Sequence, residues 1–262
     1  MNKLRKIYKE IKNVKIQGAT NIAKAGVEAY FLSPTSKNRK KIVGLRPTEP
    51  MLSNAVNLAN EWPKEEILRH FSDAQKKINV EVFKIIKNGN KILTHCHSTN
   101  VINALIYSKK KGKKFEVYNT ETRPLYQGRI TAEELSKNGI KVTNFVDSAM
   151  HEAIYKSDLI LIGADAILKK VAINKIGSGL ITELAFFHKK PIYIAADSWK
   201  FSPRNVKIEE RDFHEVWMYA PKKIKIRNPA FEKVEKKKIT KIITELGNMK
   251  YEEFLIKIEK EN

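Results

Sequence analysis

The sequence predicts an α/β protein with an N-terminal helical domain followed by a doubly wound, mainly parallel, Rossmann-like sheet domain. Two features of the 262-residue chain support this fold class. Up to about residue 88, apolar residues recur three or four positions apart, as they do along one face of a helix. From Asn88 onward, short apolar runs alternate with helical patterns, which is typical of right-handed parallel crossovers. We therefore expect a helical domain over residues 1–88 and an α/β domain over residues 89–262.

The first domain should contain three helical stretches. The first is interrupted at Gly18, the second follows Pro50, and the third spans about residues 63–87. Residues 33–46 are polar and basic, and we expect them to form a loop. In the second domain, strands are predicted at about 91–95, 115–119, 141–145, 158–162 and 191–196, with helices at about 98–110, 131–138, 148–156 and 178–188.

The formal charge of +21, from 50 basic and 29 acidic side chains, invites a polyanionic partner. Three explanations of this charge remain open. The partner could be a nucleic acid or a phosphorylated small molecule, or the lysine-rich composition could have no local meaning. The lysines are scattered and aromatic residues do not interleave with them, so nucleic-acid binding is not favoured. No apolar stretch approaches the roughly 20 residues of a membrane helix, and no secretory pattern is present. A single cysteine suits a reducing compartment, and we expect a cytoplasmic protein without membrane association.

Reactive side chains follow the predicted strands at their carboxyl ends, where a doubly wound sheet binds its ligands. They are Cys96 after the first strand, Arg123 after the second, Asp147 after the third, Asp165 after the fourth, and Lys175 just before the helix that leads to the fifth. A thiol, a carboxylate, an arginine and a lysine therefore share one rim of the sheet.

Cys96, the only cysteine, lies where a strand gives way to a helix whose N-cap position is Ser98. The helix dipole there favours the thiolate, although a lone cysteine is also commonly a small buried hydrophobe. Asp165 follows the entirely apolar strand of residues 159–162, so burial should raise its pKa and suit it to donating a proton. Capping of the following turn is the alternative role for Asp165. Together the two side chains form a candidate acid/base pair that moves a proton next to a carbonyl or acetal carbon.

Residues 174–178 have the features of an anion site. Gly177 and Gly179 permit close approach of the backbone, Lys175 supplies charge, and a helix begins at once. The spacing is not that of a P-loop, and no Gly-x-Gly-x-x-Gly follows the first strand, so no dinucleotide cofactor is expected.

His95 and His97 flank Cys96, which raises the question of a metal site. On a strand the two imidazoles would point one way and the thiol the other, so a shared ion is not favoured. The other histidines, at positions 70, 151, 188 and 214, show no ligand spacing. Cys96 could also act as a nucleophile with a histidine as its base. No protease or amidase signature surrounds it, so we rank this hypothesis below isomerase chemistry, in which Cys96 and Asp165 transfer protons.

Five short motifs, in this order, resemble one superfamily. They are Thr-His-Cys-His-Ser at 94–98, Glu-Thr-Arg-Pro at 121–124 followed by Gln127-Gly128, Val-Asp-Ser-Ala at 146–149, Gly-Ala-Asp at 163–165 and Asn-Lys-Ile-Gly at 174–177. This superfamily joins the regulatory subunits of translation initiation factor 2B to two sugar-phosphate isomerases, methylthioribose-1-phosphate isomerase and archaeal ribose-1,5-bisphosphate isomerase. The resemblance covers nearly the whole chain, and the residues around Cys96 look more like the ribose-1,5-bisphosphate enzyme.

The resemblance implies conversion of ribose 1,5-bisphosphate to ribulose 1,5-bisphosphate in archaeal AMP salvage, without a metal or organic cofactor. Asp165 would protonate the ring oxygen, and Cys96 as a thiolate would remove the proton from C2. A homodimer or a larger assembly of dimers is also implied. Contacts to the sugar and its phosphates would fall to the segment around Gln17, with Gly18 and Ala19, and to Arg46, Ser98, Arg123, Asn174 and Lys175.

Two departures from the isomerase pattern stand out. Gln17 occupies the position of a phosphate-binding arginine, and the usual Asn-Gly turn is missing between Asp165 and Asn174. Arg39 in the basic loop is a candidate replacement for the lost charge. The lost arginine and the excess charge favour one alternative, a non-catalytic initiation factor 2B-like regulatory subunit with an initiation factor partner. Methylthioribose-1-phosphate isomerase is the second alternative.

Overall fold

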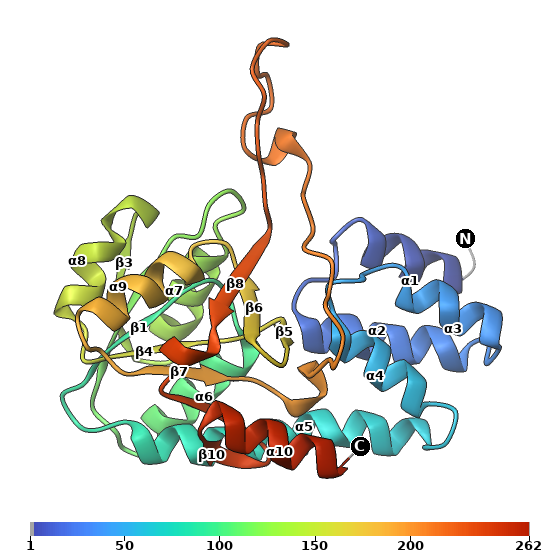
Figure 1. The fold of residues 1–262 in the computed structure, drawn as a ribbon, viewed down its shortest axis with the longest axis horizontal. Helices are drawn as coiled ribbons and strands as arrows, with labels where there is room; N and C mark the ends of the chain where they lie inside the picture. The colour runs from blue at the N-terminus through green and yellow to red at the C-terminus, as the bar shows by residue number, and fades with distance from the viewer. Residues whose placement is uncertain (1–2, 262) are drawn as a thin grey trace.

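The computed structural model describes residues 3–261. Within this range, helices come first and a sheet with helices on both faces follows, as Figure 1 shows. The N-terminal helices are α1 (Lys3–Lys12), α2 (Ala19–Phe31), α3 (Ser36–Val43), α4 (Pro50–Leu58) and α5 (Lys64–Ile85).

The loop expected over residues 33–46 is wrong in its central part, because α3 lies there. Thr35 caps this helix, accepting a hydrogen bond on Oγ1 from the Asn38 N–H at 3.1 Å. The buried Asn38 side chain donates to the carbonyl oxygens of Ala29 and Ser33, and Ile42 is fully buried. The segment was predicted to be a loop because most of its residues are polar, although Asn38 and Ile42 face inward.

The central sheet of the described chain has seven strands in the order β10-β9-β7-β4-β1-β2-β3. All neighbouring strands are parallel except β9 and β10. The strands are β1 (Lys91–Thr94), β2 (Glu116–Thr120), β3 (Lys141–Phe145), β4 (Leu159–Ile162), β7 (Ile192–Ala195), β9 (Lys241–Thr244) and β10 (Gly247–Met249). The five predicted strands are confirmed, whereas β9 and β10 were not predicted.

Alternate residues of β4 enter two different cores, as expected of a doubly wound sheet. Ile160 and Ile162 pack with α8 (Met150–Lys156), α9 (Ser178–Phe187) and α10 (Tyr251–Glu261). Leu159 and Leu161 pack with α6 (Thr99–Lys110), α7 (Gln127–Lys137) and the second half of α5. The predicted fold class is therefore confirmed, and the helix predicted at 131–138 begins earlier, at Gln127.

Helix α5 joins the two parts of the molecule. Ile67 and Phe71 in its first half belong to the core of the N-terminal helices, whereas Ile78 and Val82 in its second half pack under the sheet. The domain boundary near residue 88 remains a prediction, because α5 contributes to both cores.

A second, three-stranded sheet was not predicted. It consists of β5 (Ala166–Ile167), β6 (Val171–Lys175) and β8 (Phe231–Glu235), paired antiparallel in that order. Because β6 pairs with a strand far along the chain, no local pattern indicated this sheet.

Between β7 and β8 an arm of residues 203–229 projects from the body at the top of Figure 1. Short 3₁₀ helices lie at η1 (Asp147–Ala149), η2 (Ser198–Lys200), η3 (Phe213–Glu215) and η4 (Lys236–Lys238).

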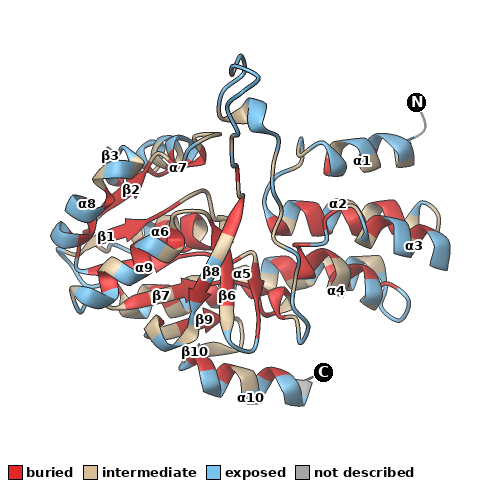
Figure 2. Cartoon of the chain, turned by 45° about the horizontal axis from the view of Figure 1, so that its top comes forward, coloured by how far each residue is buried: buried red, intermediate tan, exposed pale blue. Residues whose placement is uncertain are grey.

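Buried residues concentrate in the sheet and on the inward sides of the helices, while the arm is largely exposed (Figure 2). Over residues 3–261, no helix is long and apolar enough to cross a membrane.

Gly26 lies where α2 packs against α4. A methyl group on its Cα would overlap Leu52 Cδ1 and lie 3.2 Å from Ile42 Cγ2, and both side chains are fully buried. Alanine is the better helix former by about 1 kcal/mol. We nevertheless expect Gly26→Ala to lower the free energy of unfolding by about 1–3 kcal/mol, because overpacking displaces buried side chains. Urea unfolding measures this difference.

Gly44→Ala is the matched control. Gly44 has φ −70°, and the nearest atom to an added Cβ is 3.4 Å away. This variant should unfold at the same urea concentration as the parent protein or slightly higher. Equal losses in the two variants would contradict the packing described for Gly26.

Candidate active site

The carboxyl edge of the sheet and the N-terminus of α2 enclose a cavity. It consists of two hollows that share Gly18, Cys96 and Asp165. The residues of its wall that bear on a possible reaction are Gly18, Ala19, Arg46, Glu49, Cys96, Ser98, Asp165, Asn174, Lys175 and Lys200. The structure therefore brings together all but one of the substrate-contacting and acid/base residues expected from the sequence.

Cys96 leaves β1 with φ 65°, a left-handed conformation that is uncommon for a residue other than glycine. Two threonines hold it there. The Cys96 N–H donates to Thr122 Oγ1 at 3.0 Å, and Thr131 Oγ1 donates to the Cys96 carbonyl oxygen at 2.8 Å. These contacts turn the residue from the end of the strand into the wall of the cavity.

The Cys96 thiol holds its proton in the free protein. Burial raises its pKa to about 11, the Lys175 ammonium lowers it in part, and the Asp165 carboxylate raises it further. This shift is opposite in direction to the one that the helix dipole favours. Loss of hydration acts on the whole charge of a thiolate, whereas a helix N-terminus supplies only about half a unit of opposite charge.

Asp165 lies between β4 and β5, where its N–H donates to the Ile173 carbonyl oxygen at 2.8 Å. Within residues 3–261, no hydrogen bond or ion pair reaches its carboxyl oxygens, so the alternative role as a turn cap is not observed. Burial raises the pKa of Asp165, while the cations Lys200, Lys175 and Arg46 oppose the shift. The predicted direction of this pKa shift agrees with the structure.

The two histidines beside Cys96 are committed to protein partners. His95 Nε2 contacts the Ile176 carbonyl oxygen at 2.8 Å, and its Nδ1 contacts Thr120 Oγ1. His97 Nδ1 lies 3.1 Å from Thr131 Oγ1. Neither ring shares a metal-ligand geometry with Cys96. Among the described residues, the cluster with ligand-like spacing lies elsewhere, at His70, Asp197 and Glu245.

Lys175 and Lys200 bring positive charge into the cavity, and both side chains are buried. Lys175 is the last residue of β6, next to Asn174, whose Nδ2 donates to Ser178 Oγ at 2.8 Å. Lys200 Nζ donates to Asn100 Oδ1 at 3.2 Å. Their ammonium groups compensate negative charge on Asp165 or on a bound anion.

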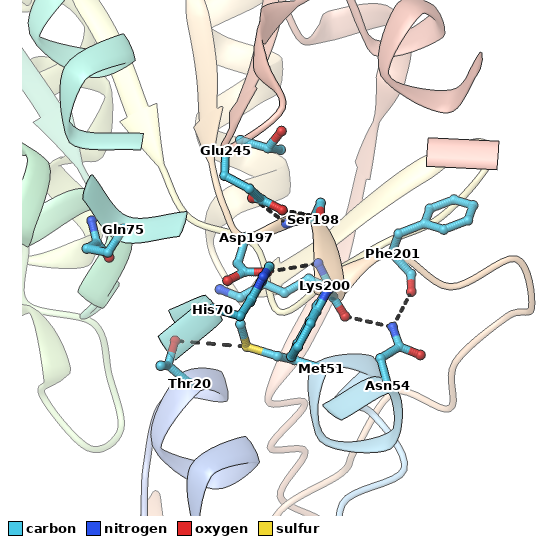
Figure 3. Close-up of polar contacts among 12 residues, drawn as sticks. Thr20, Met51, Asn54, His70, Gln75, Asp197, Ser198, Lys200, Phe201 and Glu245 are labelled. Atoms are coloured by element: carbon cyan, nitrogen blue, oxygen red, sulfur yellow. Dashed lines mark hydrogen bonds and ion pairs between the residues drawn. The ribbon is translucent and has the colours of Figure 1, made fainter. Parts of the chain in front are cut away.

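The turn that carries Lys200 is fastened at several points (Figure 3). The Trp199 N–H donates to Asp197 Oδ1 at 2.9 Å, and His70 Nε2 contacts the same oxygen at 3.1 Å. Glu245 accepts hydrogen bonds from the N–H and the hydroxyl of Ser198. Asn54 of α4 donates to the carbonyl oxygens of Trp199 at 2.7 Å and Phe201 at 2.9 Å. The turn with Lys200 is therefore held by α4, by α5 and by Glu245, the residue after β9.

Arg46 and Glu49 form a buried pair at the same cavity. Arg46 Nη2 lies 3.3 Å from Glu49 Oε1 and 3.4 Å from Glu209 Oε2. Arg46 Nε and Nη1 and Glu49 Oε2 are buried without a hydrogen-bond partner in the described chain. Burial raises the pKa of Glu49 to about 8, and the Asp165 carboxylate adds to the shift, while Arg46 opposes it.

The remaining predicted residues divide between the cavity and the surface. Ser98 occupies the N-cap position of α6 without a side-chain cap bond and lines the cavity, as do Gly18 and Ala19. Arg123 lines neither hollow; it is exposed, and its guanidinium donates to the Val216 carbonyl oxygen in the arm at 3.1 Å. The structure thus separates Arg123 from the other expected contacts. Arg39 is likewise absent from the cavity wall.

Sequence reasoning missed Lys200 and Glu49. Lys200 follows the fifth predicted strand, so the same argument from strand ends that selected Asp165 also points to it. Glu49 precedes Pro50 at the start of a helix in the first domain, far from any strand, and no sequence signal marked it.

The fold and the cavity define a Rossmann-like α/β protein with proton-carrying side chains at the carboxyl edge of its sheet. Residues 53–251 match the model of the Initiation factor 2 subunit family, and the chain belongs to this family. The family expected from the five motifs is therefore confirmed.

Relatives of the chain include an enzyme and a translation factor. It is 36% identical to ribose 1,5-bisphosphate isomerase from Methanocaldococcus jannaschii, over 94% of this chain and 91% of that protein. It resembles the solved structure of translation initiation factor eIF-2B from Pyrococcus horikoshii with a TM-score of 0.87 and 27% identity, covering 95% of this chain and 98% of that one. It also resembles 5-methylthioribose 1-phosphate isomerase from the same organism, with a TM-score of 0.78, 25% identity and coverage of 99% and 88%. The similarity to isomerases agrees with the enzyme class expected from the sequence.

Alkylation of Cys96 tests its electrostatic environment, and the presence of one cysteine makes the readout unambiguous. We expect the rate of reaction with iodoacetamide to rise with pH towards a midpoint near 11. At neutral pH the thiolate fraction should be about 100-fold below that of an ordinary thiol, because each pKa unit is a tenfold change.

Asp165→Asn should move the midpoint to lower pH, because one carboxylate charge that raises the Cys96 pKa is removed. Asp73→Asn, on α5 and outside both hollows of the cavity, is the control that should leave the midpoint unchanged. A midpoint at or below 9 in the parent protein would show that the helix N-terminus outweighs burial.

Proposed function

We propose that this protein is a sugar-phosphate isomerase that converts ribose 1,5-bisphosphate to ribulose 1,5-bisphosphate. The observation that carries the proposal is the placement of Cys96 and Asp165 on one cavity with the buried cations Arg46, Lys175 and Lys200. A carboxyl group and a thiol supply the proton transfers of an aldose–ketose isomerisation, and the cations suit a doubly phosphorylated substrate. The name of the Methanocaldococcus relative supports this choice of substrate.

The proposed reaction begins at Asp165, which donates its proton to the ring oxygen and opens the furanose at C1. The ionised Asp165 then accepts the thiol proton of Cys96, and the resulting thiolate removes the proton from C2. The thiol returns this proton to C1, and the thiolate accepts the proton of the C2 hydroxyl as the ketone forms. Both phosphates stay in place, and both side chains end the cycle protonated. This scheme accommodates a thiol that is protonated at rest.

The proposed phosphate contacts follow from groups that lack partners. Helix α2 begins after Gly18 with no side-chain cap bond, so its first N–H groups are open to an anion. Arg46 offers the buried Nε and Nη1 groups described above. Lys175 and Asn174 also line the cavity, as does Ser98 at the start of α6. Arg123 has no part in this proposal, because it lies outside the cavity.

A regulatory subunit similar to initiation factor 2B is the second candidate function. The arm favours it, since Trp217, Met218 and Tyr219 there are 49%, 58% and 90% exposed, which is unusual for large apolar side chains. Gln17 on the cavity wall, where the resemblance expects an arginine, favours it as well. This candidate requires no turnover of a sugar phosphate and retention of an initiation factor partner at physiological salt.

From the resemblance alone, we propose that the protein acts in AMP salvage and is located in the cytoplasm. We also propose that it forms a homodimer or an assembly of dimers. Sedimentation of the purified protein measures the last of these.

A coupled assay with ribose 1,5-bisphosphate and methylthioribose 1-phosphate side by side tests the proposed reaction. We expect turnover of the bisphosphate, and a loss of kcat of at least about 100-fold in Cys96→Ser and in Asp165→Asn, because each variant removes a proton-transfer group. Asp73→Asn is the surface control. Full turnover in both active-site variants would overturn the mechanism, and turnover of methylthioribose 1-phosphate alone would reassign the substrate.

A further inference from the structure

Glu49 is a buried ionisable group on the cavity wall that the proposed reaction does not use. Only 4% of its surface is exposed, and it lines the same hollow as Cys96, Asp165 and Lys175. It reaches this position from the start of α4, outside the sheet. We propose that Glu49 and Asp165 share one proton, so that Glu49 acts through Asp165 as the store of the proton that opens the sugar ring. This inference rests on the proposed function.

The contacts of Glu49 leave room for a proton. Its Oε1 lies 3.3 Å from Arg46 Nη2, but its Oε2 is buried with no hydrogen-bond partner among residues 3–261. A bidentate pair would have occupied both oxygens with two guanidinium N–H groups. A protonated Oε2 has no need of a donor, and its O–H becomes a donor within the cavity.

Arg46 neutralises Glu49 only in part, because it also serves a second carboxylate. The same Nη2 atom lies 3.4 Å from Glu209 Oε2, at the base of the arm. One guanidinium nitrogen therefore faces two carboxyl groups, while Nε and Nη1 are buried without hydrogen-bond partners in the described chain. A buried carboxylate that is incompletely paired keeps its proton to a higher pH.

The charged groups around Glu49 and Asp165 determine at which pH this pair of carboxyl groups loses its protons. Glu49 is faced by Asp165, Arg46, Lys200 and Glu209. Asp165 is faced by Lys200, Lys175 and Arg46. Burial of both carboxyl groups in one cavity makes double ionisation costly, so the apparent pKa values belong to the pair.

The shared proton has a direct use in the reaction. When Glu49 passes its proton to Asp165, the Glu49 carboxylate that remains is stabilised by Arg46, and Asp165 is ready to protonate the ring oxygen. The steps of the isomerisation then return one proton to the pair, as they return Asp165 to its acid form. Glu49 touches no reacting atom and is a positioning residue for the proton.

The pH dependence of kcat/KM tests this role. Glu49→Gln keeps the size and polarity of the side chain and removes only its titration and charge. In the parent protein, kcat/KM should fall above about pH 8, where the pair loses its last proton. In Glu49→Gln this fall should begin at least about one pH unit lower, because Asp165 loses the neighbouring negative charge and keeps its three facing cations.

Glu65→Gln is the matched control, since it makes the same substitution at an exposed residue in the first turn of α5, outside both hollows of the cavity. It should leave the pH of the fall unchanged. A uniform loss of rate in Glu49→Gln with no shift of the profile would assign Glu49 a purely structural role and overturn the proposal.

Stability against pH provides a readout that does not depend on turnover. The pKa of Glu49 is raised from 4.5 to about 8 on folding, so its contribution to stability is fully present below pH 4.5 and is lost as the pH rises through about 8. Urea unfolding between these limits should show a steeper loss of stability in the parent protein than in Glu49→Gln. Asp165→Asn should also flatten the profile, and the double variant should show less than the sum of the two effects.

The two experiments separate the possible failures. The protein could show the expected pH dependence of stability and yet turn over no sugar phosphate. That result would support the shared proton and overturn the proposed reaction. Turnover with unshifted rate and stability profiles in Glu49→Gln would support the reaction and overturn the shared proton.

Discussion

Burial of ionisable side chains in a single cavity is the constraint on which the rest of this structure depends. Three acids and three cations share the cavity, namely Glu49, Cys96, Asp165, Arg46, Lys175 and Lys200. Water would stabilise each charge alone, but within the cavity a charge persists only where an opposite charge faces it. The acids therefore hold their protons beyond their ordinary pH range, and the cations face the acids and whatever anion enters. Proton transfer rather than nucleophilic attack is the chemistry that such an arrangement favours.

The cavity exists because segments that are distant along the chain meet at one edge of the sheet. Helix α2 supplies Gly18 and the start of α4 supplies Glu49, whereas Cys96 and Asp165 follow β1 and β4. Lys175 depends on β6, which is held in place by pairing with β8 after the arm. The turn with Lys200 is hydrogen-bonded to α4, to α5 and to Glu245, the residue after β9. The histidine, aspartate and glutamate that perform this fastening have ligand-like spacing, but their facing atoms already contact protein groups.

Much of the fold and part of the site were predictable from local patterns. The apolar runs located the five parallel strands, and the rule that ligands bind at carboxyl strand ends selected Cys96, Asp165 and Lys175. The same rule failed for Arg123, which follows β2 but turns outward to the arm. It would have succeeded for Lys200 had it been applied to the last predicted strand. Helix α3 and the three-stranded sheet escaped prediction, because their formation depends on Asn38 and on the pairing of β6 with β8, respectively.

By itself, the sequence determined the alternation of strands and helices and the identity of the groups at the strand ends, because periodicity and chain order are local properties. The protonation states were decided only by the tertiary structure. A cysteine at a helix N-terminus reads as a thiolate in the sequence, yet burial raises its pKa to about 11. Glu49 carries no signal in the sequence, yet it is buried, paired with Arg46 and on the same cavity wall as Asp165. The free energy of an ionised group depends on how much water and which charges surround it in space, and that depends on the packing of distant segments.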